Sequence, residues 1–215
     1  MNGGRERPGP VSAKLKAGDP LVQNEGVREA IALGAAAVPE LVALLDLPDD
    51  DTRAQAMFAL SEIADGRART AFRRGLDDGD ERVRSYAARG LGRLGDPAAM
   101  TAFVQTLGDA PDPLHADMTS SVDGLGRLGL VSVSSLLDLL MDPDMLVRLR
   151  AQRALELIVS RRHGFRAGQG FPSPVAEEEM RAQWQANGNY RYDASSEERA
   201  AAVSKWRRWA AEAKE

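Results

Sequence analysis

The sequence contains no cysteine and very few aromatic residues. Of the 215 residues, none is cysteine and only 5% are Phe, Trp or Tyr. Disulfide bonds, thiolate nucleophiles and cysteine-ligated zinc are therefore excluded. Because apolar residues still make up 43% of the chain, alanine and leucine must build most of the core. Alanine, leucine, arginine and glutamate lose little conformational freedom in a helix, so this composition favours helices.

The chain also lacks long apolar runs and an excess of positive charge. No run approaches the roughly 18 apolar residues of a membrane-spanning helix. The Gly-, Arg- and Pro-rich start is followed by no apolar stretch, so it is not a secretory signal. The net charge of −4 argues against a nucleic-acid partner, since domains that bind nucleic acid usually carry a basic surface. We expect a cytoplasmic protein without a membrane segment.

Residues that could form a catalytic or metal site are sparse. The two histidines, His115 and His163, have no partners at metal-ligand spacing. The glycines of 124–129 resemble a dinucleotide-binding loop but end a helix rather than follow a strand, and 90–95 repeats them. Acidic groups such as 49–51 could do acid–base chemistry or bind calcium, but they fall on expected turns where helix capping explains them. The sequence therefore predicts a protein that is not an enzyme, with no cofactor and no metal.

The most informative feature that is present is an internal repeat. Three stretches that begin at Asp49, Asp80 and Asp144 share the order Asp, three residues, Arg, two residues, Ala, three residues, Leu. A degenerate copy runs over 114–125, with Met118 at the arginine position. Successive copies start 31, 34 and 30 residues apart, which suits a compact helix pair. The equivalent leucines are Leu60, Leu91, Leu125 and Leu155.

A second apolar set precedes each copy and predicts the first helix of each pair. In the first unit this set is Leu41, Leu44 and Leu45, spaced i, i+3 and i+4, which places one buried stripe on a helix. Each unit is then a helix A, a turn rich in Asp, Pro or Gly, and a helix B whose leading Asp can cap its free N–H groups. The counterparts are Phe72, Gly75 and Leu76, then Phe103, Thr106 and Leu107, then Leu136, Leu139 and Leu140.

Over about residues 27–160 this repeated pattern resembles the HEAT repeats, and specifically their phycobilisome-lyase-like class. The resemblance implies an all-α fold, a right-handed α-solenoid of about four helix pairs, with the B helices on its concave surface. It also implies a ladder in which each repeat arginine meets acidic turn residues of a neighbouring unit. We expect 27–33 to form the second helix of an incomplete first pair, the ladder to break at Met118, and the array to kink at the turn 108–113.

The two ends of the chain differ from the repeats. We predict a disordered N-terminus over residues 1–10, a solenoid over 11–162 and a C-terminal capping segment over 163–215. Seven of the eleven aromatic residues lie in this last segment, so it should fold.

Two helices are expected in the C-terminal segment. One should run over about 173–187, and the other should begin at Ser195 with a capping box to Glu198. Solenoids need a cap over their final apolar face. We therefore expect the three tryptophans to pack on the last repeat, with an aromatic ligand pocket as the alternative.

Helix B also carries a candidate partner-binding face. Arg82, Tyr86, Arg89 and Arg93 are spaced i, i+4, i+7 and i+11, away from the core stripe that includes Leu91. Arginine and tyrosine are common in interface hot spots, and solenoids often bind through such a surface. The alternative is a solvated face without a partner. The predicted site for another protein or peptide consists of Phe58, Tyr86, Arg89, Arg93, Arg127, Arg150 and Arg153.

Three functions remain open at this point. The first is a non-enzymatic scaffold or adaptor that binds a partner protein on the helix-B face. The second is a chromophore-handling protein similar to the phycobilin lyases, which share this repeat class. The third is a HEAT-like nucleic-acid-binding protein, which the acidic net charge disfavours. The sequence names neither the partner nor the oligomeric state.

Overall fold

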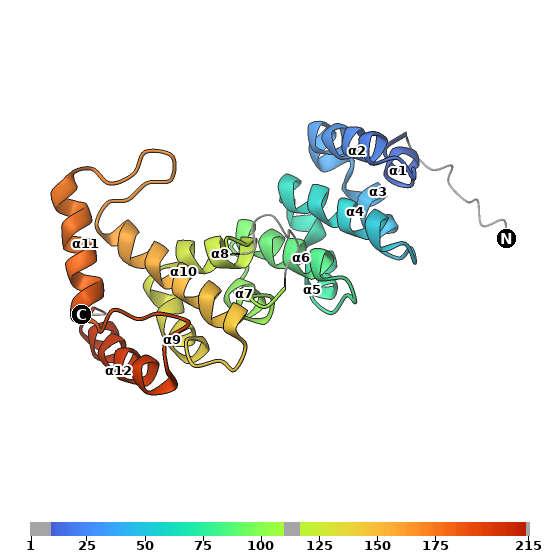
Figure 1. Cartoon of the computed structure of the whole chain (residues 1–215). Helices are drawn as coiled ribbons and strands as arrows, with labels where there is room; N and C mark the ends of the chain where they lie inside the picture. Colours follow the sequence, from blue (N-terminus) through green and yellow to red (C-terminus); the bar gives the residue numbers. More distant parts are fainter. Residues whose placement is uncertain (1–9, 110–116, 214–215) are drawn as a thin grey trace. The chain divides into compact units, whose positions relative to one another are not determined.

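The computed structural model describes residues 10–109 and 117–213, which form helices joined by turns and loops (Figure 1). Within these ranges the only β-type pairing is an isolated bridge between Arg166 and Gly170. The prediction of an all-α solenoid is confirmed. No helix in the described ranges is long and apolar enough to cross a membrane. The expectations for residues 1–9, for His115 and for a kink within 110–113 lie outside the described residues.

The chain divides into two structural units, Met1–Ala102 (unit 1) and Phe103–Glu215 (unit 2). Unit 1 contains three helix pairs, and helix α7 (Ala99–Gln105) begins at its end. The pairs are α1 (Pro10–Leu15) with α2 (Pro20–Leu33), α3 (Val38–Leu44) with α4 (Asp50–Ile63), and α5 (Arg69–Gly75) with α6 (Glu81–Arg93). Two short 3-10 turns, η1 (Gly34–Ala36) and η2 (Gly66–Ala68), precede α3 and α5.

Residues 27–33 belong to the second helix of the first pair, as predicted, but the prediction that this pair is incomplete is wrong, because α1 precedes α2. Helix α2 starts earlier, at Pro20, where proline at the first position costs no hydrogen bond. The Asp19 carboxylate caps it by accepting from the Leu21 N–H at 2.8 Å. Helix α1 packs against α2, with Val11 and Leu15 fully buried. The aspartate–proline signal was present in the sequence and marks the true start of the helix.

Unit 2 contains the end of α7 and five further helices. These are α8 (Ser120–Leu128), α9 (Leu130–Leu139), α10 (Met145–Arg162), α11 (Pro174–Ala186) and α12 (Ser196–Glu212). The four predicted helix pairs therefore correspond to α3/α4, α5/α6, α7/α8 and α9/α10. The repeat leucines that define their register, Leu60, Leu91, Leu125 and Leu155, are all fully buried.

The residue before each B helix caps it, as the repeat predicts. Asp49, Asp80 and Asp144 each accept hydrogen bonds from backbone N–H groups in the first turn of the helix that follows. In the degenerate copy the same task falls to Thr119, whose hydroxyl accepts from the Val122 N–H at 3.4 Å. In the third copy, helix B is therefore capped by a hydroxyl group instead of a carboxylate. The repeat pattern did not predict this cap, because the copy has no aspartate.

Inside each repeat, one residue of helix A and one residue of helix B are in contact and have complementary sizes. Gly90 on α6 lies against the buried ring of Phe72, and a Cβ placed on it would fall 2.4 Å from that ring. Gly124 on α8 faces Phe103 in the same way, at 2.3 Å. At the equivalent positions the first and fourth copies hold leucine on helix A and alanine on helix B, which are Leu41 with Ala59 and Leu136 with Ala154. A large ring on helix A therefore requires glycine on helix B.

This pairing predicts that Gly90→Ala lowers the unfolding free energy of the wild type but raises that of the Phe72→Leu variant. In the wild type the new methyl group meets the Phe72 ring, and overpacking of a core costs about 1–3 kcal/mol of unfolding free energy. In a Phe72→Leu background that contact is relieved. Alanine then stabilises the helix by roughly 0.5–1 kcal/mol relative to glycine. Urea midpoints of the four proteins measure both effects, and a Gly90→Ala change of the same sign in both backgrounds would refute the pairing.

The C-terminal segment packs on the last repeat of unit 2. Helix α11 contacts α10, and α12 contacts α9. The predicted capping box is present, because the Ser195 hydroxyl accepts from the Glu198 N–H and the Glu198 carboxylate accepts from the Ser195 N–H. Trp206 is fully buried, with the rings of Trp184 and Trp209 centred 4.9 and 5.1 Å from it. The three tryptophans thus pack on one another, and the Arg162 guanidinium of α10 lies 5.8 Å from the centre of the Trp209 ring.

Candidate functional site

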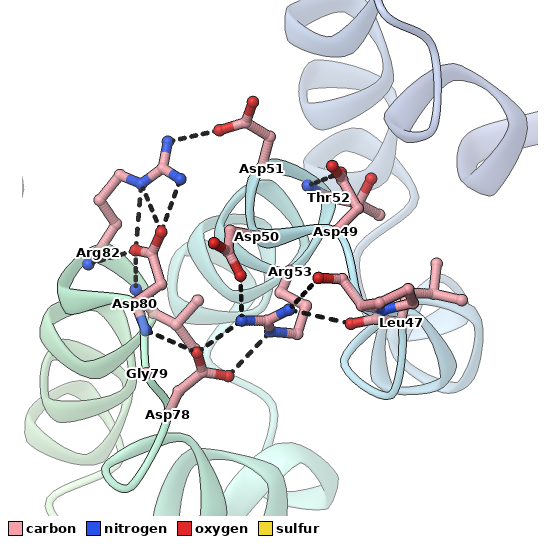
Figure 2. Close-up of polar contacts among 12 residues, drawn as sticks. Leu47, Asp49, Asp50, Asp51, Thr52, Arg53, Asp78, Gly79, Asp80 and Arg82 are labelled. Atoms are coloured by element: carbon pink, nitrogen blue, oxygen red, sulfur yellow. Dashed lines mark hydrogen bonds and ion pairs between the residues drawn. The ribbon is translucent and has the colours of Figure 1, made fainter.

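The repeat arginine of the first copy ties two adjacent repeats of unit 1 together (Figure 2). Arg53 donates from Nη1 to the carbonyl oxygens of Leu47 and Pro48, at 3.0 Å each. Its Nε and Nη2 donate to both carboxylate oxygens of Asp78, in the turn of the next repeat, at 3.0 and 2.9 Å. Burial opposes the ionisation of Asp78, but the Arg53 hydrogen bonds, the hydrogen bond from the Asp80 N–H and the charge of Arg53 together outweigh it, so the pKa of Asp78 is lowered. The predicted ladder is therefore present at this step.

The hydrogen bonds from the repeat arginine to two carbonyl oxygens of its own unit recur in the other two copies that keep the arginine. Arg84 donates from Nη1 to the carbonyl oxygens of Asp78 and Gly79, at 2.9 and 3.0 Å. Arg148 donates to those of Asp142 and Pro143, at 2.7 and 2.8 Å. Each guanidinium thus satisfies carbonyl groups in the turn that follows its own helix A. These arginines are built into the framework and are not available to a partner.

The degenerate copy solves the same problem with a residue from the next repeat. Met118 cannot donate a hydrogen bond and is 44% exposed. Arg150, on α10, instead donates from Nη1 to the carbonyl oxygens of Leu107 and Asp109, at 2.8 and 2.7 Å. In the repeat alignment Asp109 is equivalent to Leu47, so Arg150 reaches the kind of carbonyl that Arg53 reaches in its own copy.

Arg150 therefore has a different position from the one predicted for it. It was expected on an exposed partner-binding face, yet it is fully buried. The physical reason is that the third copy has no ladder arginine. The carbonyl groups in the turn after α7 therefore accept hydrogen bonds from the Arg150 guanidinium, which turns inward to reach them. Arg150 is thus removed from the candidate partner surface.

The capping segment continues the ladder beyond the last repeat. Arg148 donates from Nε to the Tyr192 carbonyl at 3.0 Å, and the Tyr192 N–H donates to Gln152 Oε1 at 2.9 Å. The Tyr190 hydroxyl donates to the carbonyl of Leu140 at 2.5 Å. Leu140 is the repeat equivalent of Leu107, so Tyr190 occupies the place that Arg150 has one repeat earlier. Residues 190–192 therefore act as the edge of a further repeat, which accounts for the cap in atomic terms.

The buried Tyr190 hydroxyl predicts a loss of stability at high pH. Burial raises the pKa of Tyr190 to about 12, although Arg199 and Arg148 pull the other way. In the unfolded chain a tyrosine ionises near pH 10, so above that pH the unfolded state releases a proton that the folded state keeps. Unfolding free energy should be level below about pH 10 and fall by about 2–3 kcal/mol towards pH 12. Urea midpoints at several pH values measure this slope, and Tyr190→Phe should flatten it; an equal slope in both proteins would exclude Tyr190 as its source.

The predicted partner face of unit 1 is organised around Phe58. Its ring lies edge-on to Tyr86, with centroids 5.1 Å apart at 61°. The Arg89 guanidinium lies 5.6 Å from the centre of the Phe58 ring and pairs with Glu62. Arg93 pairs with the other oxygen of Glu62 at 3.0 Å. The four predicted residues of this unit, Phe58, Tyr86, Arg89 and Arg93, are therefore brought together on adjacent B helices.

Glu62 is the member of this cluster that the sequence prediction missed. Its side chain is 23% exposed and bridges Arg89 and Arg93, which come from the next repeat. A signal was present, because Glu62 and Arg93 occupy equivalent positions in adjacent copies and carry opposite charge. The bridge holds Arg89 in a fixed orientation over Phe58.

The two remaining predicted residues, Arg127 and Arg153, lie in unit 2. Arg127 has a side chain that is 74% exposed and pairs with Asp123 on the same helix at 2.7 Å. Arg153 pairs with Glu156 at 2.8 Å and with Asp117 at 3.4 Å. No aromatic ring stacks on either guanidinium among the described residues, so these two arginines form a polar surface without an anchor.

Hollows lie in both units. In unit 1 a hollow of about 410 Å³ lies at the start of α2 and α4, and its lining includes Lys16, Gln23, Asp49 and Asp51. In unit 2 a hollow of about 290 Å³ separates α10 from α11 and is lined by residues that include Trp184. The described residues bring no three His, Cys, Asp or Glu side chains into a group that could hold a metal ion.

Comparison with known proteins assigns the family. The model of the HEAT repeats matches residues 38–121 and 76–156, which together cover 119 of the 215 residues. The chain belongs to the HEAT-repeat family. No curated protein sequence matches this HEAT-repeat chain.

Two engineered proteins are among the similar solved structures. One is described only as an engineered protein; it is 19% identical, with 92% of this chain and 95% of that chain covered and a TM-score of 0.42. The other is a designed armadillo repeat protein, 16% identical, with 91% and 98% covered and a TM-score of 0.44.

Proposed function

We propose that this HEAT-repeat protein is a non-enzymatic scaffold or adaptor that binds another protein or a peptide. Helical repeat arrays commonly serve as extended binding surfaces. The binding site that we propose is the helix-B face of unit 1, formed by α4 and α6. The observation that carries this assignment is the ordered cluster of Phe58, Tyr86 and Arg89 on two neighbouring repeats.

The state of this cluster before binding supports the proposal. Phe58 and Tyr86 are half-buried, and a third of the Arg89 side chain, 32%, is exposed. Aromatic and arginine side chains that are already held in place lose little conformational freedom when a partner binds. They are also the residue types that contribute most to interface hot spots. The arginines of unit 2, Arg127 and Arg153, remain a secondary part of the proposed surface.

Removal of the anchor should abolish most partner binding. The double variant Phe58→Ala/Arg89→Ala is expected to lose about 30-fold or more in affinity, since a hot-spot truncation costs at least about 2 kcal/mol. Partners are first captured from the native cell, identified by mass spectrometry, and then measured as purified proteins. The matched control is Arg74→Ala, which removes an exposed arginine of α5 that pairs with Asp46 at 3.0 Å. A double variant that folds and keeps the affinity of the Arg74→Ala control would reject this face as the site.

The two alternative functions are tested separately. The resemblance to the phycobilisome-lyase-like class stays a prediction, and a bilin titration followed by absorbance tests chromophore handling. A gel shift at two salt concentrations tests nucleic-acid binding, because phosphate contacts weaken steeply with salt. Neither alternative has a specific contact in the described residues to favour it over the scaffold.

A further inference from the structure

The helix-B face of unit 1 carries opposite charge at its two ends. Near the start of the helices, the single guanidinium of Arg82 lies between two carboxylates, Asp51 at 2.7 Å and Asp80 at 2.7 Å. Near the end of the helices the ratio is inverted, since the single carboxylate of Glu62 lies between Arg89 and Arg93. One end therefore has a surplus negative charge and the other a surplus positive charge.

The negative end adjoins the 410 Å³ hollow of unit 1. Asp51 both pairs with Arg82 and lines this hollow, and its side chain is 63% exposed. Asp49 lines the same hollow, and hydrogen bonds from Thr52 lower the pKa of its carboxyl group, so it stays charged at neutral pH. Among the described residues that line the hollow, Lys16 is the one basic side chain, against these two carboxylates. The hollow is thus suited to the long basic side chain of a partner.

The positive end offers an exposed guanidinium. Arg93 has a side chain that is 42% exposed, and it shares Glu62 with Arg89, so its charge is only partly compensated. A carboxylate of a partner can bind its free donors without displacing Glu62. Between the two ends lie Phe58 and Tyr86, whose rings provide an apolar contact.

The length of the face sets the spacing of the partner's charges. The eleven residues from Arg82 to Arg93 span about 16 Å at 1.5 Å per residue. An extended peptide covers that distance with about five residues, since each advances it by roughly 3.3 Å. The apolar contact falls near the middle of this span.

We propose that the helix-B face of unit 1 selects a peptide segment with a basic residue at one end, an apolar residue in the middle and an acidic residue at the other end. The basic side chain enters the hollow beside Asp51, the apolar one covers Phe58, and the carboxylate binds Arg93. This inference rests on the proposed function and specifies its partner.

Three synthetic peptides test the charge order. Each has six residues, blocked ends and leucine at the two central positions. The first and last residues are Arg and Glu in one peptide, Arg and Arg in the second, and Glu and Glu in the third. Two-dimensional NMR titration of the full-length protein gives both affinity and the residues that respond. The Arg/Glu peptide should bind about two- to fivefold more tightly than either like-charged peptide, which is the effect of one exposed ion pair. The preference should shrink in high salt.

Two single variants should redirect the preference. Asp51→Lys makes both ends positive, so the Glu/Glu peptide should become the best ligand. Arg93→Glu makes both ends negative, so the Arg/Arg peptide should become the best. Both substitutions are on the surface, and melting temperatures close to that of the wild type will show that the fold is kept.

The outcomes separate this inference from the proposed function. If the peptides shift resonances of α4 and α6 but rank equally in all three proteins, the charge order is wrong and the face still stands. If the shifts map outside α4, α6 and the residues that line the hollow, both the inference and the site are wrong. If no peptide binds the wild type, the inference is overturned, while the capture experiment with Phe58→Ala/Arg89→Ala still decides the proposed function.

Discussion

Replacing Arg150 with methionine is expected to lower the unfolding free energy of unit 2 by about 2–5 kcal/mol. The guanidinium is fully buried and donates to the carbonyl oxygens of Leu107 and Asp109. Methionine has a similar length but no donor, so these carbonyl groups lose a charged partner where solvent cannot fully replace it. An unpaired buried polar group costs more than the net gain of an ordinary hydrogen bond.

The measurement is tryptophan-detected urea unfolding, because all three tryptophans lie in unit 2. Arg153→Met is the matched control on the same helix; its side chain is 41% exposed, and exposed ion pairs contribute about 1 kcal/mol or less. Arg150→Lys should recover part of the loss, since an ammonium can still donate to one carbonyl. Equal midpoints for Arg150→Met and Arg153→Met would show that the buried guanidinium does not hold the turn after α7.

Deletion of residues 164–215, which is all of the capping segment except His163, should have the largest effect. It removes the Tyr190 bond to Leu140 and the Tyr192 contacts to Arg148 and Gln152. It also uncovers the apolar surface that Trp206 buries. Truncation of one buried tryptophan to alanine costs about 3–5 kcal/mol of unfolding free energy. Loss of the whole segment removes more contacts than that, so we expect the last repeat to unfold.

We expect the truncated protein to aggregate, because a large exposed apolar patch promotes association. The matched variant Trp206→Ala keeps the chain intact and should be destabilised but monomeric. Size-exclusion chromatography and circular dichroism melting distinguish the two. A monomeric truncation with an unchanged melting temperature would show that the segment is an independent appendage instead of a cap.

The fold could be predicted from the sequence because its signals are local and repeated. In each copy that keeps the order Asp, Arg, Ala, Leu, the Asp is placed to cap helix B and the Arg to make the ladder contact. The Ala lets neighbouring helices approach closely, and the Leu fills the core. Asp80 and Leu91 do what the spacing predicts, and Arg84 donates to carbonyl oxygens of the turn in its own unit. The errors occur where the pattern is incomplete, as at α1 and α2, whose start depended on Asp19 and Pro20 alone.

The candidate site could be predicted only in part, because its contacts run between repeats. The prediction that Phe58, Tyr86, Arg89 and Arg93 share one face was correct, since helical spacing determines it. Position on a helix does not determine where a long flexible side chain turns. Arg150 stands at the position of Tyr86 in the alignment, yet it reaches inward because Met118 leaves carbonyl groups unpaired.

The most direct test of the central claim is amide hydrogen exchange on the protein with and without its captured partner. We predict that exchange slows in α4 and α6, the two helices that present Phe58 and Arg89, and stays unchanged in α5 of the same unit. Slowing confined to α5, or to the capping helices α11 and α12, would contradict the assignment of the helix-B face as the binding surface.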